Sequence, residues 1–377
     1  MFLKDAIALT RKLIAFNTVN PPGDEAEIAR FIGSILTENG FFVDYIPYED
    51  KRLQLVAEKG VSAGIQPLVF TGHFDTVPLG AQKWSFNPFG GKIKGDQLYG
   101  RGSSDMKGGL AAMIIAAIQA FQNGEPKEGI RLIFTAAEES GCHGAKQLVK
   151  TYDKIGQACG IVVGEPTANL PATGHKGAVY LNMTTSGKTA HSSMPHLGDN
   201  AIYKAARAIL KVEKFDFCAE EDPLLGWATV NVGKISGGLN LNSVPDFAGF
   251  TVDARTTTKV DHEEFLSKLK KEIGAEARME TLVNLKAVTS NENDPFVQRV
   301  YAACGVGEAA PGYPKSLPYL TDGSVLQGAY GGAPTVILGP GQPEMAHQTN
   351  EFCSIAKLEE AVSIYKNIIL NKGKNHE

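Results

Sequence analysis

Short apolar runs alternate with amphipathic stretches through the first part of the chain and again near its end. Residues 25–39 place isoleucine and leucine at helical spacing, and Gly40 follows as a helix-ending residue. Buried strands are predicted where the chain is continuously apolar, at residues 67–70, 130–137, 161–163 and 336–338. Up to about Lys176, this alternation predicts an α/β sheet with helices on both faces.

A different pattern begins at residue 177. Half-exposed strands are predicted at residues 179–185, 230–235 and 247–253, and amphipathic helices at residues 200–212 and 262–273. A small sheet with two helices is typical of a split ferredoxin-like unit. The α/β pattern resumes beyond about Ala287 and ends in a predicted helix over residues 356–370. We therefore expect a domain of residues 177–287 inserted into a larger one made of residues 1–176 and 288–377.

Composition narrows the functional classes. The 377 residues exceed the usual size of one hydrophobic core, and a formal net charge of −4 gives no general attraction to nucleic acid or to anionic membranes. The first residues lack the pattern of a signal peptide, and the apolar stretch at 110–121 is too short to cross a bilayer, so it is predicted to be a buried helix. Five cysteines without Cys-x-x-Cys spacing argue against a disulfide framework and predict a cytoplasmic protein.

The first candidate chemistry follows the apolar run at 67–70. His73 and Asp75 are two residues apart, so in a strand their side chains share a face. An aspartate there can accept a hydrogen bond from the histidine nitrogen that does not bind metal, which makes the other nitrogen a better ligand. The pair predicts a metal ligand and its orienting partner, and the alternative is an ordinary hydrogen-bonded histidine at a strand end.

Further metal-binding residue types occur after the other apolar runs. Glu139 follows the run at 130–137, Glu165 follows the run at 161–163, and His347 lies a few residues beyond the run at 336–338. Asp105 lies in a glycine-rich loop before the predicted buried helix. Such a mixed set of oxygen and nitrogen ligands suits zinc and, less tightly, cobalt or manganese. Five ligands fit two ions better than one.

These segments, from Asn17 to Glu351, resemble the co-catalytic zinc metallopeptidase family that contains acetylornithine deacetylase, succinyl-diaminopimelate desuccinylase, aminoacylases and related carboxypeptidases. The resemblance implies an α/β catalytic domain with a central mixed sheet and helices on both faces, plus an inserted α+β dimerisation or lid domain. It also implies a homodimer with two Zn²⁺ per subunit, for which Co²⁺ can substitute.

The resemblance also assigns ligand roles. Asp105 is expected to bridge both metals, with His73 and Glu165 completing one site and Glu139 and His347 completing the other.

The same resemblance makes Glu138 the general base and Asp75 the partner of His73. A glutamate bound to zinc has its lone pairs committed to the cation, whereas its unbound neighbour can take a proton from a metal-bridging water and pass it to the leaving amine. The alternative for an adjacent glutamate pair is two solvated carboxylates at a strand end.

The predicted inserted domain carries a second constellation. The segment around His191 resembles the family motif whose histidine contacts substrate from the partner subunit, and Asn242 and Arg255 match positions that hold the substrate carboxylate. A histidine can donate to an oxyanion, and arginine offers a two-pronged donor for a carboxylate. A surface ion pair is the alternative for Arg255.

Together these features predict a metal-dependent amidohydrolase that removes an N-acyl group from a small N-acyl amino acid through attack of a metal-bridging water. Residues 338–341 and 346–348 resemble acetylornithine deacetylases, residues 198–202 are shared with desuccinylases, and residues 320–324 depart from the desuccinylase pattern. A desuccinylase, a dipeptidase or carboxypeptidase, and a catalytically inactive metal-binding protein are the alternatives.

Other chemistries fit less well. Dinucleotide binding needs Gly-x-Gly-x-x-Gly and a serine hydrolase needs Gly-x-Ser-x-Gly, and the chain offers neither in the required context. Cys142 precedes His143 directly, but adjacent side chains point apart, so Cys142 is predicted to be a packing residue. His262, at a predicted helix start, is expected to be solvated.

Overall fold

The computed structural model describes residues 5–62, 64–124, 126–306 and 315–372, and they form two compact units. One unit runs to Gly174 and resumes at Thr289–Lys315 and from Thr321 onward. The other unit consists of His175–Val288 and Ser316–Leu320.

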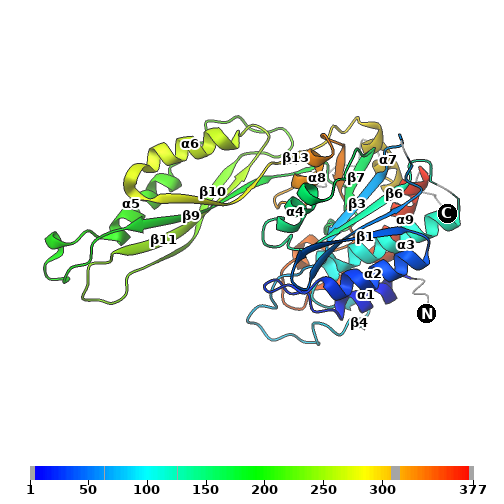
Figure 1. Ribbon diagram of the computed structural model, residues 1–377, viewed down its shortest axis with the longest axis horizontal. Coiled ribbons are helices and arrows are strands. Elements are labelled where there is room, and N and C mark those ends of the chain that lie inside the picture. Colours follow the sequence, from blue (N-terminus) through cyan, green and yellow to red (C-terminus); the bar gives the residue numbers. More distant parts are fainter. Residues whose placement is uncertain (1–4, 63, 125, 307–314, 373–377) are drawn as a thin grey trace. The chain divides into compact units, whose positions relative to one another are not determined.

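The first unit is built on a six-stranded sheet with the order β1-β2-β6-β3-β7-β15 (Figure 1). Its strands are β1 (Phe42–Glu49), β2 (Arg52–Lys59), β6 (Ile130–Thr135), β3 (Leu68–His73), β7 (Gly160–Val163) and β15 (Thr335–Ile337). The first two pairings are antiparallel and the other three are parallel, which confirms the predicted mixed sheet. Strands β3, β6 and β7 are buried along their whole length, as continuous apolar runs require.

Helices cover both faces of this sheet, as predicted (Figure 1). The largest core joins one face to α1 (Ala6–Ile14), α2 (Ala26–Glu38), α3 (Gly108–Gln122), α7 (Pro295–Cys304) and α9 (Ile355–Leu370). Helices α4 (His143–Thr151) and α8 (Gly323–Ala329) lie on the opposite face. Helix α3 confirms the predicted buried helix, and no described helix is long and apolar enough to cross a membrane.

A small three-stranded sheet lies beside this core, with the order β16-β5-β4. Its strands are β4 (Lys92–Lys94), β5 (Gln97–Tyr99) and β16 (Phe352–Ser354). Because β16 pairs antiparallel with β5, it brings the segment after His347 next to the loop that contains Asp105. The two-residue strands β8 (Gly174–His175), β13 (Val288–Thr289) and β14 (Ser316–Leu317) lie where the chain passes from one unit to the other.

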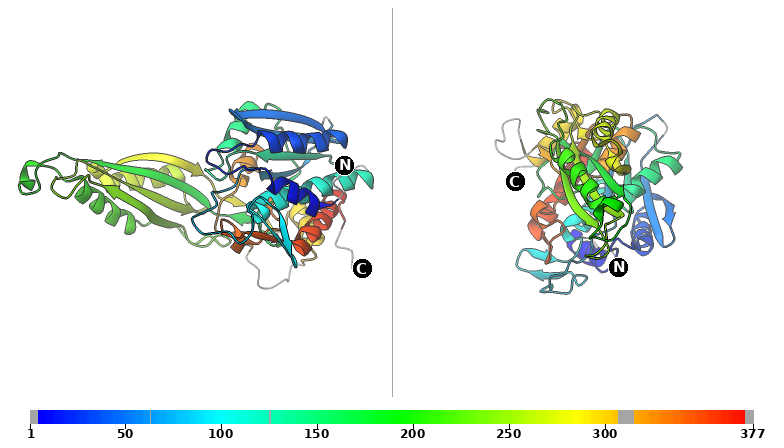
Figure 2. Two further views of the ribbon diagram at one scale, coloured as in Figure 1. Left: turned by 90° about the horizontal axis from the view of Figure 1, so that it is seen from below. Right: turned by 90° about the vertical axis from the view of Figure 1, so that its left-hand side faces the viewer.

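The second unit is a four-stranded antiparallel sheet with the order β10-β11-β9-β12, with two helices on one face (Figures 1 and 2). Its elements are β9 (Gly177–Ser186), α5 (Ala201–Glu213), β10 (Thr229–Gly237), β11 (Phe247–Thr256), α6 (His262–Ile273) and β12 (Arg278–Leu285). Side chains of both helices and of the alternating strand positions form a separate core. The three predicted strands and two predicted helices are present, whereas β12 was not predicted.

His262 corrects one expectation, because it is buried at the start of α6 rather than solvated. Its Nε2 lies 2.8 Å from the Thr256 hydroxyl and its Nδ1 lies 2.5 Å from Asn284 Oδ1. Two polar partners satisfy both ring nitrogens, so the ring can leave solvent at low cost.

Candidate active site

The candidate site lies at one edge of the six-stranded sheet. Strands β3, β6, β7 and β15 run parallel, so their carboxyl ends meet at the same edge. His73 is the last residue of β3, the Glu138–Glu139 pair follows β6, and Glu165 follows β7. This topology explains why residues far apart in sequence come together here.

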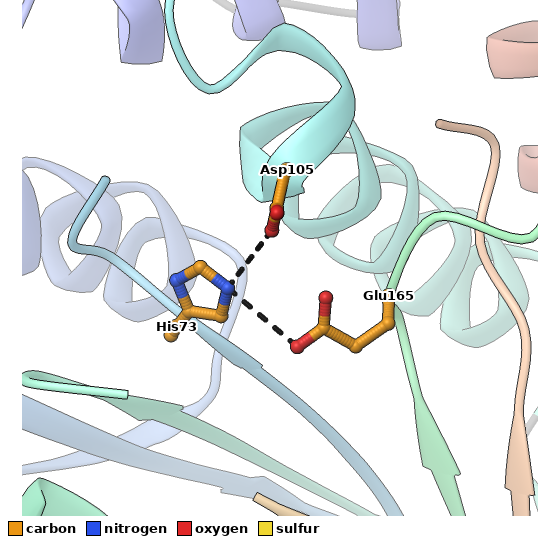
Figure 3. Close-up of side chains that lie close together, drawn as sticks. All are labelled: His73, Asp105 and Glu165. Carbon is orange, nitrogen blue, oxygen red and sulfur yellow. Dashed lines mark hydrogen bonds and ion pairs between the residues drawn. The ribbon is translucent and has the colours of Figure 1, made fainter. Parts of the chain in front are cut away.

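His73, Asp105 and Glu165 form the first cluster (Figure 3). The Nε2 atom of His73 lies 3.2 Å from Asp105 Oδ1 and 3.5 Å from Glu165 Oε1. All three side chains are buried. One imidazole nitrogen and two carboxylates therefore converge on one point, which is a suitable donor set for a divalent cation.

Asp105, Glu139 and His347 form the second cluster. The Nε2 atom of His347 lies 3.0 Å from Glu139 Oε2 and 3.5 Å from Asp105 Oδ2. The two oxygens of Asp105 therefore face different histidines, and Asp105 belongs to both clusters. His347 has a positive φ of 63° and is the most exposed member, with 56% of its side chain accessible.

Asp75 differs from the sequence expectation in the atom that meets His73. The Nδ1 atom of His73 lies 2.9 Å from the backbone carbonyl oxygen of Asp75, whereas the nearest carboxylate oxygen is 3.6 Å away. Strand β3 ends at His73, so the alternation that would place both side chains on one face stops there. The Asp75 carboxylate instead accepts the backbone N–H groups of Glu138 and Glu139 at 3.1 and 3.2 Å, and the Asn20 side-chain amide at 2.9 Å.

Glu138 is buried beside the two clusters. Its Oε1 accepts a hydrogen bond from the Cys142 thiol at 3.4 Å, and its carboxylate, that thiol and Asp322 form a third close group. Burial raises the pKa of the Cys142 thiol well above its usual range, so the thiol stays protonated and is no nucleophile. Burial also raises the pKa of Asp322 to about 6, although Thr135 donates a hydrogen bond to it.

The titration of the site reflects many carboxylates in a dry environment. Burial raises the pKa of Glu138 and of Glu165 well above the usual range, and the charge of His73 offsets part of this effect. Burial and the negative charge of Asp105 raise the pKa of Glu139. Burial opposes protonation of His73, but the charge of Glu165 and the hydrogen bond to Asp105 outweigh it and raise the pKa of His73 well above its usual range.

The residues fit bound divalent cations by their chemistry. Buried carboxylates in close proximity repel one another unless protons or cations compensate their charge. The Oε1 atom of Glu139 is buried and has no hydrogen-bond partner within the described part of the chain. An oxygen left without a donor, in a cluster of carboxylates and imidazoles, is the environment that a cation would complete.

Three predicted site residues lie in the second unit and are described within it. His191 is exposed and forms an isolated β-bridge with Ser243. The N–H of the next residue, Ser192, donates to the carbonyl of Asn242 at 3.0 Å. The His191 and Asn242 segments therefore lie side by side. Arg255 makes a two-pronged ion pair with Asp253 on the same strand, at 2.8 and 3.1 Å. An ion pair was the alternative role that the sequence analysis gave for Arg255, and the structure contains one.

Two residues of the site region were not predicted from the sequence, Asp322 and Glu351. Asp322 lies against Glu138, and Glu351 accepts hydrogen bonds from the Asp105 loop. Both are fully buried carboxylates in polar loops. The only signals in the sequence were the acidic residue before Gly323 and the acidic residue four positions after His347.

Comparison with known proteins identifies relatives along the whole chain. Residues 69–371 match the profile of "Peptidase family M20/M25/M40". The chain is 30% identical to a "Probable succinyl-diaminopimelate desuccinylase" of Staphylococcus epidermidis, covering 97% of each protein, and 28% identical to an "Acetylornithine deacetylase" of Vibrio campbellii, covering 93% of each.

Solved structures share the fold. The M20 family metallo-carboxypeptidase Sso-CP2 of Sulfolobus solfataricus superposes with a TM-score of 0.82 at 19% identity, covering 98% of this chain and 99% of that one. The YXEP protein of Bacillus subtilis, described as a dinuclear metal-binding peptidase of the same family, has a TM-score of 0.68 at 16% identity, covering 97% and 96%.

Proposed function

The chain belongs to peptidase family M20/M25/M40 and is a hydrolase of amide bonds, and from that premise we propose that it removes an N-acyl group from a small N-acyl amino acid. The observation that carries the proposal is the pair of ligand clusters that share Asp105, with Glu138 beside them. A catalytically inactive metal-binding protein would not need that buried carboxylate.

An acetyl group is the acyl group we propose, removed from the amino group of ornithine or a related basic amino acid. Residues 338–341 and 346–348 support it by their resemblance to acetylornithine deacetylases, as does the relative with that name at 28% identity. A succinyl group is the second candidate, because the relative at 30% identity is named a probable succinyl-diaminopimelate desuccinylase.

Two divalent cations per subunit are proposed, zinc by the donor set, with cobalt as a substitute. His73 and Glu165 would hold one cation, Glu139 and His347 would hold the other, and Asp105 would belong to both sites. Bound cations supply Lewis-acid chemistry, which polarises a substrate carbonyl and lowers the pKa of water.

Glu138 is the proposed general base. Its carboxylate is buried, and its backbone N–H is fixed by the Asp75 carboxylate. Burial raises the pKa of this carboxyl well above that of a free glutamate. It would accept a proton from the attacking water and return it to the leaving amine nitrogen.

The second unit is proposed to form a symmetric dimer and to supply His191 to the partner's site. Strand β10 is an edge strand of the described sheet, and Ile235 on it is exposed, as are Tyr203 and Leu210 on α5. Exposed apolar side chains of this size on neighbouring elements favour a protein interface. Asn242 and Arg255 are proposed to hold the substrate carboxylate, for which Arg255 would exchange its contact with Asp253.

The unpaired state of all five cysteines supports a cytoplasmic location, which stays a prediction.

A substrate panel tests the proposed reaction. Zinc-loaded protein is assayed for kcat/KM on N-acetylornithine, N-succinyl-diaminopimelate, N-formyl amino acids and dipeptides, with the Glu138→Gln variant purified in parallel to measure contaminating activity. We expect the acetyl substrate to lead by about tenfold or more, the scale of one well-placed pocket contact. A succinyl preference would replace the acyl assignment, and hydrolysis of dipeptides alone would contradict a deacylase.

A further inference from the structure

The carboxylate of Glu351 is the most heavily hydrogen-bonded acid near the candidate site. It is fully buried, and its Oε1 accepts the backbone N–H groups of Ser104 at 2.8 Å and of Asp105 at 3.0 Å. Its Oε2 accepts the N–H of Gly102 at 2.9 Å and Arg101 Nη1 at 2.7 Å. One side chain therefore receives four donors from a stretch of five residues.

That stretch does not form a continuous helix that could satisfy its own backbone. The π-helical turn Ser103–Lys107 precedes α3, but within it Asp105 has φ −122° and ψ 92°, and Met106 is also non-helical. Gly102 has a φ of +83°, a conformation that favours glycine. The loop N–H groups are thus pointed toward a common acceptor, which Glu351 supplies. Without that acceptor, three buried donors would lose their partners.

Glu351 reaches this position because of strand pairing. Phe352 in β16 pairs with Tyr99 in β5, and the carbonyl of Glu351 accepts the N–H of Gly100 at 3.0 Å. Glu351, the residue before β16, therefore lies next to the loop that follows β5. Since His347 precedes Glu351 by four residues, one short segment carries both a member of the second cluster and the support of Asp105.

A second link fastens the same two segments. The Ser104 hydroxyl donates to the carbonyl of Phe352 at 2.6 Å and accepts the N–H of Gln342 at 3.1 Å. The loop around Asp105 is thus attached both to the chain before His347 and to the chain after it. Neither link touches the two oxygens of Asp105, which stay directed at His73 and His347.

From these contacts we infer that Glu351 is a positioning residue that holds Asp105 in the orientation needed to bind two cations at once. The inference rests on the proposed function, because it assigns a task to Asp105 as the shared ligand. Groups that orient metal ligands typically change metal affinity by about 10–100-fold when they are replaced.

Glu351→Gln is the sharpest test. Glutamine keeps the size of the side chain but places an NH₂ group against N–H donors, so about half of the acceptor capacity is lost. Glu25→Gln is the matched control. Glu25 is also fully buried and accepts two hydrogen bonds from Arg52, at 2.6 and 2.8 Å, but these donors lie outside the Asp105 loop. Zinc affinity is measured by competition with a chromogenic chelator, on protein whose folded fraction is first checked by circular dichroism.

We expect Glu351→Gln to bind zinc about 10–100-fold more weakly than wild type, and Glu25→Gln to lose stability without losing affinity. Equal zinc affinity of wild type and Glu351→Gln would overturn the inference while leaving the proposed function intact. A wild-type protein that binds no zinc would instead reject the proposed function. Glu351→Asp keeps the charge but shortens the side chain, so its oxygens lie farther from the loop, and it is also expected to bind zinc more weakly. Failure of both Glu351 variants to fold would reject a positioning role in favour of a purely structural one.

Discussion

Replacing Glu138 by glutamine should separate proton transfer from metal binding. Glutamine keeps the size of the side chain and an oxygen that can still accept from the Cys142 thiol, which lies 3.4 Å from Glu138 Oε1. The loop stays in place, because Asp75 binds the backbone N–H of residue 138 rather than its side chain. The substitution removes the ability to take up a proton, together with the negative charge of the carboxylate.

General acid–base catalysis contributes about 10²–10⁴-fold, so kcat should fall by that factor. This corresponds to about 3–5 kcal/mol of transition-state stabilisation. Zinc content should stay at the wild-type level, since Glu138 belongs to neither of the two ligand clusters. The comparison variant Glu139→Gln loses the charge that faces His347 at 3.0 Å, and it should bind zinc at least about 10-fold more weakly.

The assay is steady-state hydrolysis of the best N-acyl substrate, with elemental analysis of the same samples. Wild-type kcat in Glu138→Gln would refute its role as the base. Equal zinc loss in the two variants would refute the division of roles between the adjacent glutamates.

Three further outcomes are expected. Burial lowers the pKa of His175 to about 4, although the contact of its Nδ1 with the carbonyl of Lys176 opposes this shift. The free energy of unfolding should therefore fall by about 3 kcal/mol as the pH drops from about 6.5 to 4. Denaturant titrations should show this pH dependence in wild type and not in His175→Gln. A Cβ at Gly339 would overlap backbone carbonyl oxygens, so Gly339→Ala should destabilise the folded protein by about 1–3 kcal/mol, measured by thermal unfolding. The control Gly328→Ala adds a Cβ to open space in α8 and should not destabilise the protein. Random mixed dimers of Glu138→Ala and His191→Ala subunits should regain about a quarter of wild-type activity, and verified mixed dimers without activity would reject the trans role of His191.

The alternation of apolar runs and amphipathic stretches was sufficient to predict the sheet, because buried parallel strands are continuous apolar runs. The grouping of His73 with Glu165 came instead from the family resemblance, and the parallel strands explain why the two residues meet. The edge strand β1 was harder to predict, because it contains Pro47 and exposes Phe42. Strand β12 was missed because a register shift between Thr281 and Val283 interrupts its alternation.

Atomic contacts at the site depend on tertiary structure that no local pattern encodes. Asp75 is the partner of His73 as expected, but its backbone carbonyl lies nearer to the ring than its carboxylate, at 2.9 Å against 3.6 Å. The carboxylate also binds the backbone of the Glu138 loop. Glu351 acts on a loop about 250 positions away through the β16–β5 pairing, and its sequence neighbourhood looks like an ordinary polar turn. His262 was expected to be solvated because its partners, Thr256 and Asn284, come from strands β11 and β12 and not from its own helix.

The sharing of Asp105 by two cations is the central claim, and zinc titration of metal-free protein tests it most directly. Protein stripped with a chelator is titrated with zinc while bound metal and activity on an N-acyl amino acid are recorded together. Two ligand clusters that share one carboxylate predict activity that rises to its maximum at about two equivalents, and an Asp105→Asn variant that loses binding at both sites. Full activity in protein shown to be free of metal, or saturation at about one equivalent with Asp105→Asn unchanged, would contradict the account.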